Sequence, residues 1–151
     1  MELFRISLKE YSKTLSGSGA ASRWNHEGEC VIYAGSSRSL STLELVVHRN
    51  SIEELSAYEM MVISVADDED LIEQIRIENL PDNWRSFRAY SMLQELGSAW
   101  YRRQRTLFLR VPSAVIPQEY NYILNTRHPL FSKNVTLVRN EEYFFDERLF
   151  G

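Results

Sequence analysis

The chain has 151 residues, of which 44% are hydrophobic and 12% aromatic, so it is long enough for one domain with a sizeable core and too apolar to be disordered. Its 17 Lys and Arg residues against 21 Asp and Glu residues give a net charge of −4, which argues against a general nucleic-acid binder, and its single cysteine excludes a disulfide framework or a cysteine-rich zinc site. The positive charge is unusual because 14 of the 17 basic residues are arginine, the side chain that binds phosphate or carboxylate through two parallel hydrogen bonds.

Residues 3–8 and 31–34 are short apolar segments that predict the first two strands, and a Gly-Ser-Ser turn follows the second. Ser39 is predicted to cap a helix that ends near Arg49. On a helical wheel Glu44 lies at the border of the apolar stripe of this helix, which is formed by Leu40, Leu43 and Val47.

The second half of the chain continues this mixed pattern. Residues 60–65 predict a buried strand, and residues 84–103 predict a long helix whose apolar face is Ala89, Leu93, Leu96 and Trp100 and whose polar face is Arg88, Ser91, Glu95 and Ser98. Further strands are predicted at residues 107–111, 121–124 and 135–138. Because strands and helices do not alternate strictly, an α+β fold is favoured over a doubly wound one.

The sequence shows no recognisable signal peptide or membrane-spanning segment. The first five residues are not a basic segment followed by an apolar one, and no segment approaches the roughly 20 apolar residues of a membrane span. We therefore expect a cytoplasmic protein with no membrane contact. No internal repeat and no long Pro/Gly-rich linker is visible, so residues 1–151 are expected to form a single domain.

Charge is distributed unevenly along the chain. Residues 50–80 hold nine acidic residues and one basic residue, whereas residues 84–110 hold six arginines and one acidic residue. Two solvated faces of opposite sign explain this pattern. The alternative is an arginine face that attracts an anionic ligand or an acidic partner.

A few polar side chains are candidates for chemistry, each with a structural alternative. Glu44, beside His48 one helical turn later, is partly desolvated if it borders a buried face, or it simply rims the core. The segment Ser22 to Asn25 is dense in recognition groups, but its tryptophan would also suit a structural loop. Tyr33 at a strand end and Ser113 after Pro112 have common structural roles as a half-buried aromatic and a turn cap.

The common enzyme motifs do not occur. The chain has no phosphate-binding loop and none of the motifs G-x-G-x-x-G, H-E-x-x-H or G-x-S-x-G. The three histidines lack metal-ligand spacing, so no metal site is expected. Cys30 is interpreted as a buried structural thiol. Patterns alone thus indicate an α+β domain suited to binding an anion.

Nine short sequence blocks nevertheless stand in a characteristic order. They are Gly19-Ala20 with Arg23-Trp24-Asn25 and Gly28, Val31-Ile32-Tyr33-Ala34, Ser39 to His48, Leu80-Pro81-Asp82-Asn83-Trp84, Gly97-Ser98-Ala99-Trp100, Val111 to Pro117, Glu119 to Asn125, His128-Pro129, and Phe145-Asp146-Glu147-Arg148-Leu149. From about Arg5 to Leu149 the chain therefore resembles the RES-domain family, which is named for an arginine, a glutamate and a serine.

The resemblance implies a fold like that of the ADP-ribosyltransferase toxins, with small antiparallel sheets flanked by helices. It implies the toxin of a bacterial type II toxin–antitoxin pair, with NAD+ as substrate and an antitoxin with an Xre-like helix-turn-helix domain as partner. A homodimer within the toxin–antitoxin complex is expected, with no cofactor, no metal and no direct nucleic-acid contact. The implied catalytic residues are Arg23, Tyr33, Glu44 and Ser113, and the implied substrate-binding residues are Arg5, Trp24, Asn25, His48 and Asn121.

The implied reaction breaks the N-glycosidic bond between nicotinamide and ribose through an oxocarbenium-like transition state. Glu44 would stabilise the positive charge that develops on the ribose. Tyr33 would stack on nicotinamide or the ribose, and Arg5 and Arg23 would bind the pyrophosphate. Ser113 would hydrogen-bond either the nicotinamide amide or a ribose hydroxyl.

Three residues depart from the family pattern, two of them in one loop. Ala21-Ser22 stands where Gly-Gly commonly precedes Arg-Trp-Asn, in a loop shorter than usual, and Ile6 stands where a tyrosine often follows the first arginine. Glycines allow a backbone to approach a ligand closely, so the departures concern the NAD+ contacts of this loop. They do not touch the four implied catalytic residues.

Several functions remain open at this point. The first is degradation of NAD+ by hydrolysis or phosphorolysis, and the second is transfer of ADP-ribose to a protein target at the same site. The third is a non-catalytic interaction module, which only the altered Ala21-Ser22 loop favours. Nucleic-acid cleavage is disfavoured by the negative net charge and by the lack of a metal or paired-histidine site.

Overall fold

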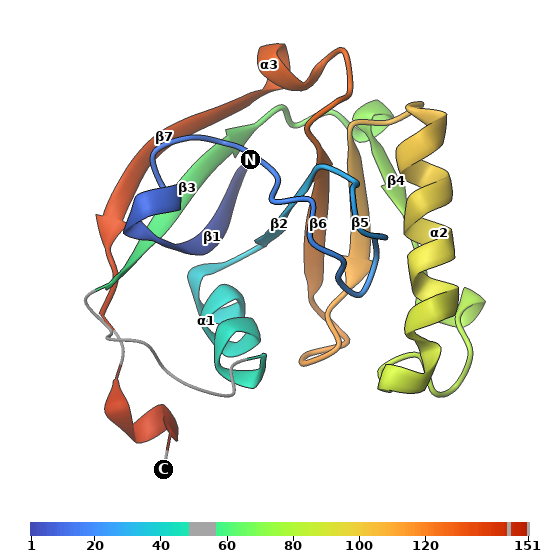
Figure 1. The fold of residues 1–151 in the computed structure, drawn as a ribbon, viewed down its shortest axis with the longest axis horizontal. Helices are drawn as coiled ribbons and strands as arrows, with labels where there is room; N and C mark the ends of the chain where they lie inside the picture. The colour runs from blue at the N-terminus through green and yellow to red at the C-terminus, as the bar shows by residue number, and fades with distance from the viewer. Residues whose placement is uncertain (49–56, 145, 151) are drawn as a thin grey trace.

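A seven-stranded sheet runs through the described residues, 1–48, 57–144 and 146–150, of the computed structural model (Figure 1). Its order is β4-β5-β6-β2-β1-β3-β7, and neighbouring strands are antiparallel except β4 and β5, which are parallel. The strands are β1 (Glu2–Leu8), β2 (Val31–Gly35), β3 (Tyr58–Val65), β4 (Ile72–Gln74), β5 (Phe108–Pro112), β6 (Tyr120–Asn125) and β7 (Val135–Glu142). The helices are α1 (Arg38–Val47), α2 (Tyr90–Arg103) and the short α3 (Phe131–Asn134).

The sheet consists of two groups of strands that meet at a single point. Strands β4, β5, β6 and β2 form one group, and β1, β3 and β7 form the other. Between the groups, β1 and β2 pair only at Phe4 and Gly35, so the two strands diverge beyond this pair. The predicted α+β architecture of small antiparallel units flanked by helices is confirmed, and the divergence decides where the site lies.

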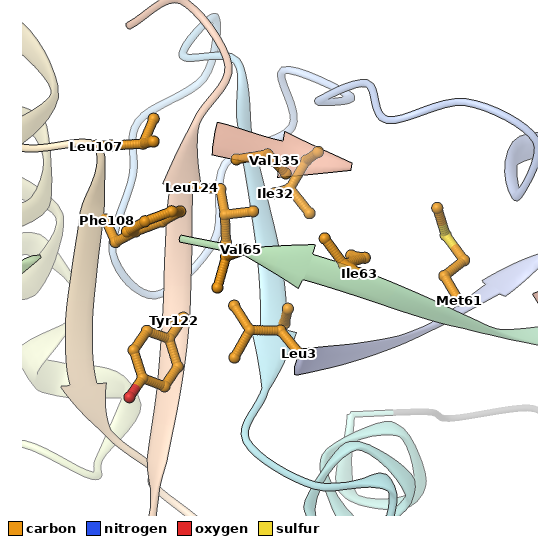
Figure 2. Packing of buried hydrophobic residues seen from close by; sticks show 11 residues of the cluster. Leu3, Ile32, Met61, Ile63, Val65, Leu107, Phe108, Tyr122, Leu124 and Val135 are labelled. Carbon is orange, nitrogen blue, oxygen red and sulfur yellow. The ribbon is translucent and has the colours of Figure 1, made fainter. Parts of the chain in front are cut away.

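Side-chain alternation along the strands divides the core into two faces. On β3, for example, Met61 and Ile63 point to one face and Met60 and Val62 to the other. Figure 2 shows the cluster on the first face, to which both strand groups contribute through residues such as Leu3, Ile63, Phe108 and Leu124. Because its largest members are almost fully buried, this cluster joins the two groups where their hydrogen bonding is sparse.

The second face is covered by the two longer helices. Leu93 and Trp100 of α2 pack with Trp24 and with residues of β5 and β6. Leu45 and Val46 of α1 instead pack against the β1–β3 group, on Phe4, Met60 and Val62. Each helix therefore covers one strand group, and in the view of Figure 1 strands β2, β6 and β5 lie between the two helices.

The six predicted strands are confirmed, with small shifts at their ends. The seventh, β4, has only three residues, too few for a recognisable alternation, and it forms because its backbone pairs with β5. The last strand continues from residue 138 to Glu142 through charged residues, as an edge strand with solvent on one side can. None of the helices in the described ranges has the length and apolar character needed to cross a membrane.

Helix α1 differs from its prediction at both ends. Its cap is Ser37, not Ser39, since the Ser37 hydroxyl accepts a hydrogen bond of 3.0 Å from the Leu40 amide. The helix ends at Val47, which is 60% exposed and not part of the buried stripe; Arg49, the predicted end, lies outside the described residues. Leu40 is buried as predicted, but the buried face turns toward Ser41, because the Ser41 hydroxyl donates to the Phe4 carbonyl of β1.

Separate alanine substitutions of Ser37 and Ser39 test which serine caps α1. Ser37→Ala is expected to lower the free energy of unfolding by about 1 kcal/mol, because the Leu40 amide loses its acceptor. Ser39→Ala, at an exposed position inside the helix, is expected to leave stability unchanged or slightly higher, since alanine is the better helix former. Urea denaturation of both variants measures the difference, and a larger loss in Ser39→Ala would contradict the assignment.

Helix α2 is shorter and rotated relative to its prediction. It begins at Tyr90 after a 3-10 turn over Phe87–Ala89, and residues 84–86 precede that turn. Of the predicted faces, Leu96 is 40% exposed and Ser98 is fully buried, so both assignments were wrong. The reason is Gly97: it lies directly against the Trp24 backbone, which turns the helix so that residues 97 and 98 face inward.

Part of the uneven charge distribution is neutralised by the fold. Because β4 lies beside β5, the acidic segment before and in β4 meets the arginine-rich segment around β5. Arg103 lies 2.8 Å from Glu73, and Arg110 lies 3.3 Å from Glu69. These pairs are largely exposed and contribute little stability. The predicted acidic and basic faces are therefore neighbours, and some of their charges pair directly.

Candidate active site

A pocket of about 330 Å³ lies where β1 and β2 diverge, in the size range typical of small-molecule sites. Its floor comes from β1 and β2, and α1 and the loop of residues 22–24 form part of its walls. Its charged and polar lining residues are Arg5, Ser22, Arg23, Tyr33, Ser41, Glu44, His48 and Asn121. The remaining lining is mostly apolar, with Phe4, Ile6, Trp24, Ala34, Gly35, Leu45, Pro112 and Ala114.

Side chains complete the hydrogen bonding that the diverging strands lose. Arg5 Nη1 donates to the Tyr33 carbonyl of β2 at 2.9 Å, and Ser41 Oγ donates to the Phe4 carbonyl of β1 at 2.8 Å. Buried carbonyls need such partners, so these two bonds hold the strands apart. Gly35 is required beside them, because a Cβ there would lie 2.5 Å from Ser41 Oγ.

Glu44 projects from α1 into this opening with both carboxylate oxygens engaged. Its Oε1 accepts hydrogen bonds from Ser113 Oγ at 2.6 Å and from Asn121 Nδ2 at 2.8 Å. Its Oε2 lies 3.1 Å from His48 Nε2, one turn along the same helix. The side chain of Glu44 is 19% exposed and that of His48 is 47% exposed, so Oε2 is on the solvent side.

Burial alone would raise the pKa of Glu44, but the hydrogen bonds from its three partners outweigh burial and hold the pKa below the usual range of a glutamate. Glu44 is therefore ionised at neutral pH. Because its pKa is lower in the folded than in the unfolded chain, ionised Glu44 stabilises the fold above the unfolded pKa. That contribution is lost as the pH falls through the folded pKa.

Removing one partner tests this balance. Asn121→Ala removes one of the hydrogen bonds that lower the pKa of Glu44, whereas the burial that raises it stays. The pKa of Glu44 is therefore expected to rise. If ionised Glu44 is needed for activity, the acidic limb of the pH profile of kcat/KM moves to higher pH. Asn83→Ala, at an exposed position, is the matched control and is expected to leave the limb in place. An unchanged limb in Asn121→Ala would show that the amide does not tune Glu44.

Ser113 supports Glu44 from behind. It is fully buried after β5 and is not part of the pocket lining. Its hydroxyl donates to Glu44 and accepts from the backbone amides of Val115 and Ile116, both at 3.1 Å. The donor of Ser113 is thus committed to the carboxylate. A direct contact with nicotinamide or a ribose hydroxyl stays a prediction that this arrangement does not favour.

Two arginines face the pocket without an acidic partner in the described part of the chain. Arg5 is half-buried, and its desolvation lowers the pKa of its guanidinium, which stays protonated at any ordinary pH. Arg23 Nη1 donates to the carbonyls of Trp84 and Arg85 at 3.3 and 3.2 Å, and its guanidinium lies 4.8 Å from the ring centre of Tyr90. Cations held this way, with donors left over, favour an anionic ligand.

The Tyr33 hydroxyl fixes the turn that carries Arg23. It donates to Asn25 Oδ1 at 2.5 Å and accepts from the Trp24 amide at 3.1 Å. Burial raises the pKa of Tyr33, which keeps the phenol neutral and able to donate. Asn25 is 1% exposed and also donates to the carbonyls of Ala20 and His26, so it lies behind the pocket.

Of the nine predicted site residues, all but Ser113 and Asn25 line the pocket. The apolar wall, including Phe4 and Ile6, was not predicted, although the i, i+2 spacing in the first strand places these two residues on one face. Glu29, Gly97 and Ser98, which connect the loop of residues 20–30 with α2, were also missed. In the described ranges, no group of three or more His, Cys, Asp or Glu side chains is arranged to hold a metal ion.

A solved structure shows a similar fold. One chain of the crystal structure of the M. tuberculosis MbcT–MbcA toxin–antitoxin complex aligns with a TM-score of 0.75 at 18% identity. The alignment covers 94% of this chain and 83% of that chain. This likeness confirms the α+β, ADP-ribosyltransferase-like fold.

Sequence relatives cover nearly the full length. A protein named Toxin Res from Yersinia enterocolitica serotype O:8 is 36% identical over 153 residues, which covers 99% of both chains. A protein named Prs ADP-ribosylating toxin from a Sphingobium species is 36% identical over 140 residues, which covers 89% of this chain and 86% of the relative. The family model of the RES domain matches residues 2–146. The chain therefore belongs to the RES-domain family.

Proposed function

We propose that this chain is the toxin of a toxin–antitoxin pair and that it cleaves the bond between nicotinamide and ribose in NAD+. The observation that carries the proposal is the Glu44 carboxylate, held ionised by three hydrogen-bond partners on the wall of a pocket. The same pocket presents Arg5 and Arg23, for which the described residues provide no acidic partner. The pocket thus offers a negative group for a developing cation and positive groups for a diphosphate.

The chemistry of the bond suits this arrangement. The nicotinamide ring of NAD+ carries a positive charge, and it leaves with the electron pair of the C–N bond as neutral nicotinamide. The positive charge then lies on the ribose as an oxocarbenium-like species, which a carboxylate beside it stabilises. Water or phosphate forms the new C–O bond to the same carbon. With water as acceptor, a proton is released and the product is ADP-ribose.

The other lining residues supply binding contacts in this proposal. Arg5 and Arg23 bind the diphosphate through donors that are not used by carbonyls. The ring of Tyr33 lines the pocket while its hydroxyl is held away, so the ring is available for stacking. Phe4, Ile6 and Leu45 form an apolar wall on which an aromatic ring can pack.

Transfer of ADP-ribose to a protein is the second candidate. It is favoured by the name of the Sphingobium relative, Prs ADP-ribosylating toxin, which is 36% identical to this chain. The same site would serve, because the nicotinamide–ribose bond breaks in either case and only the acceptor differs. The acceptor must therefore be identified by experiment.

An antitoxin is the proposed protein partner. The structurally similar chain was solved in a toxin–antitoxin complex, and the Yersinia and Sphingobium relatives both have the word toxin in their names. We propose in addition that the antitoxin is Xre-like, that the complex contains a homodimer of this chain, and that the complex is cytoplasmic. The protein without antitoxin is the form to assay, because a partner can obstruct the pocket.

Incubation of the purified protein with NAD+, with and without phosphate, tests the proposal through free nicotinamide. Release is expected, and the mass of the second product distinguishes water from phosphate as the acceptor. Labelled NAD+ added to a bacterial lysate gives a labelled protein band only if a protein is the acceptor. No release under any of these conditions would contradict an NAD+-cleaving function. If NAD+ also failed to raise the melting temperature, a non-catalytic module would be supported instead.

A further inference from the structure

Helix α2 holds the loop of residues 20–30 from behind the pocket. We infer that Glu29, Gly97 and Ser98 are positioning residues, which fix the Arg23 turn against α2 and so set the place of the Arg23 guanidinium in the pocket. This inference rests on the proposed function, because Arg23 is taken there to bind the diphosphate. None of the three lines the pocket, so they act through Arg23.

Gly97 makes the closest contact between helix and loop. A Cβ built at this position would lie 1.6 Å from the Trp24 carbonyl oxygen and 2.7 Å from the carbonyl carbon. Any side chain larger than hydrogen must therefore push the turn away from α2. Trp24 itself is 3% exposed, and its indole packs in the cluster with Leu93 and Trp100, so the turn has little room to shift.

Glu29 connects the far side of the turn to the same helix. Its Oε1 accepts 2.7 Å hydrogen bonds from the His26 amide in the loop and from Ser98 Oγ on α2. The Ser98 hydroxyl is fully buried, so its donor needs this partner. One oxygen thus closes the loop onto itself and fastens it to α2.

Further contacts surround this connection. Gln94 Nε2 donates to the Ser22 carbonyl at 2.9 Å, and the Cys30 amide donates to Tyr101 Oη at 3.3 Å. They secure the loop on α2 before and after the Arg23 turn.

The side chain of Arg23 is held by the same part of the chain. Its contacts with the Trp84 and Arg85 carbonyls and with Tyr90 are all at or just before the start of α2. The Arg23 backbone is therefore held by α2, and its guanidinium is held by the segment that precedes α2 and by Tyr90, the first residue of the helix. A displaced turn would move the backbone while those carbonyls stay in place, so Arg23 would reach the diphosphate in a different geometry.

Substitution of Glu29 tests the inference against a matched control in the same loop. Glu29→Ala is expected to raise the KM for NAD+ about tenfold with a smaller change in kcat, because the loss is in binding geometry. Glu29→Gln keeps an oxygen acceptor for both donors and is expected to restore KM to within about threefold. Glu27→Ala removes the same charge from an exposed neighbour and is expected to have no effect.

Hydrogen–deuterium exchange of residues 20–30 provides a readout that does not depend on activity. Faster exchange is expected at the His26 amide in Glu29→Ala and not in Glu27→Ala. If Glu29→Ala does not fold, Ser98→Ala takes its place. It leaves the bond from the His26 amide to Glu29 but removes the attachment of Glu29 to α2, so a rise in KM and faster exchange across residues 20–30 are expected. Unchanged KM in the folded variant, or faster exchange without a rise in KM, would overturn the inference. If the wild type releases no nicotinamide, the proposed function fails, whereas exchange still reports whether Glu29 holds the loop.

Discussion

Glu44→Gln is expected to lower the rate of nicotinamide release from NAD+ by about 100- to 1,000-fold, the size of effect seen when one preorganised electrostatic group is removed from an active site. Glutamine keeps the shape of the side chain and an oxygen that Ser113 and Asn121 can still donate to. It cannot stabilise a positive charge on the ribose. The loss should therefore be in kcat more than in KM.

Glu73→Gln provides the control for this experiment. Glu73 is a partly exposed glutamate of β4, paired with Arg103 and absent from the pocket lining, so its substitution is expected to leave the rate unchanged. The melting temperature of Glu73→Gln should stay close to that of the wild type, and that of Glu44→Gln is recorded alongside because ionised Glu44 also stabilises the fold. A Glu44→Gln enzyme within about threefold of wild-type rate would contradict the role assigned to the carboxylate.

Arg5→Lys is expected to raise the KM for NAD+ by about 10- to 100-fold, which corresponds to losing a charge-assisted hydrogen bond of about 1.5–3 kcal/mol. Arg5 uses one donor on the Tyr33 carbonyl and keeps the others for a ligand. Lysine carries one ammonium group on a flexible stem, so it cannot hold the strand and present a fixed fork to a diphosphate at the same time. Steady-state kinetics on nicotinamide release measures the effect.

Arg76→Lys is the matched substitution at an exposed position outside the pocket, and no change in KM is expected there. Because Arg5 also bridges β1 and β2, the melting temperature of Arg5→Lys is recorded alongside. A normal KM in a folded Arg5→Lys protein would show that the diphosphate is bound elsewhere.

Hydrogen bonds explain how the Glu44 carboxylate stays ionised in a small pocket, although no arginine or lysine in the described ranges forms an ion pair with it. Ser113 and Asn121 come from β5's end and β6, strands that are remote in sequence from α1. Together with His48, which lies 3.1 Å from Oε2, these neutral donors stabilise the negative charge through hydrogen bonds. A buried arginine partner would instead cancel the charge that the reaction needs.

The many arginines of this chain have two different structural roles. Arg5 and Arg23 line the pocket without acidic partners in the described ranges, as expected for ligands of a phosphate group. Arg103 and Arg110, from the arginine-rich segment, instead pair with glutamates near β4. The amino-acid composition predicts an anion-binding protein, but it does not predict which arginines bind the anion.

Local pattern was sufficient for much of the fold. Short apolar segments located six strands, because each strand contributes side chains to a core cluster, and a helix around Glu44 followed from the apolar stripe next to it. The ordered blocks of the RES-domain resemblance indicated the family and the site residues, of which seven line one pocket. Elements whose burial follows from their own periodicity can be predicted in this way.

Tertiary contacts decided the rest. Ser98 reads as polar and exposed on a helical wheel, yet it is buried because Gly97 lets the Trp24 carbonyl approach α2 and Glu29 accepts its hydroxyl. The state of Glu44 depends on donors 69 and 77 residues further along the chain, which no local pattern relates to it. The sequence by itself determined the elements, the family and the candidate residues. Only the tertiary structure determined which face of each helix is buried and which groups tune the carboxylate, since both depend on long-range packing and desolvation.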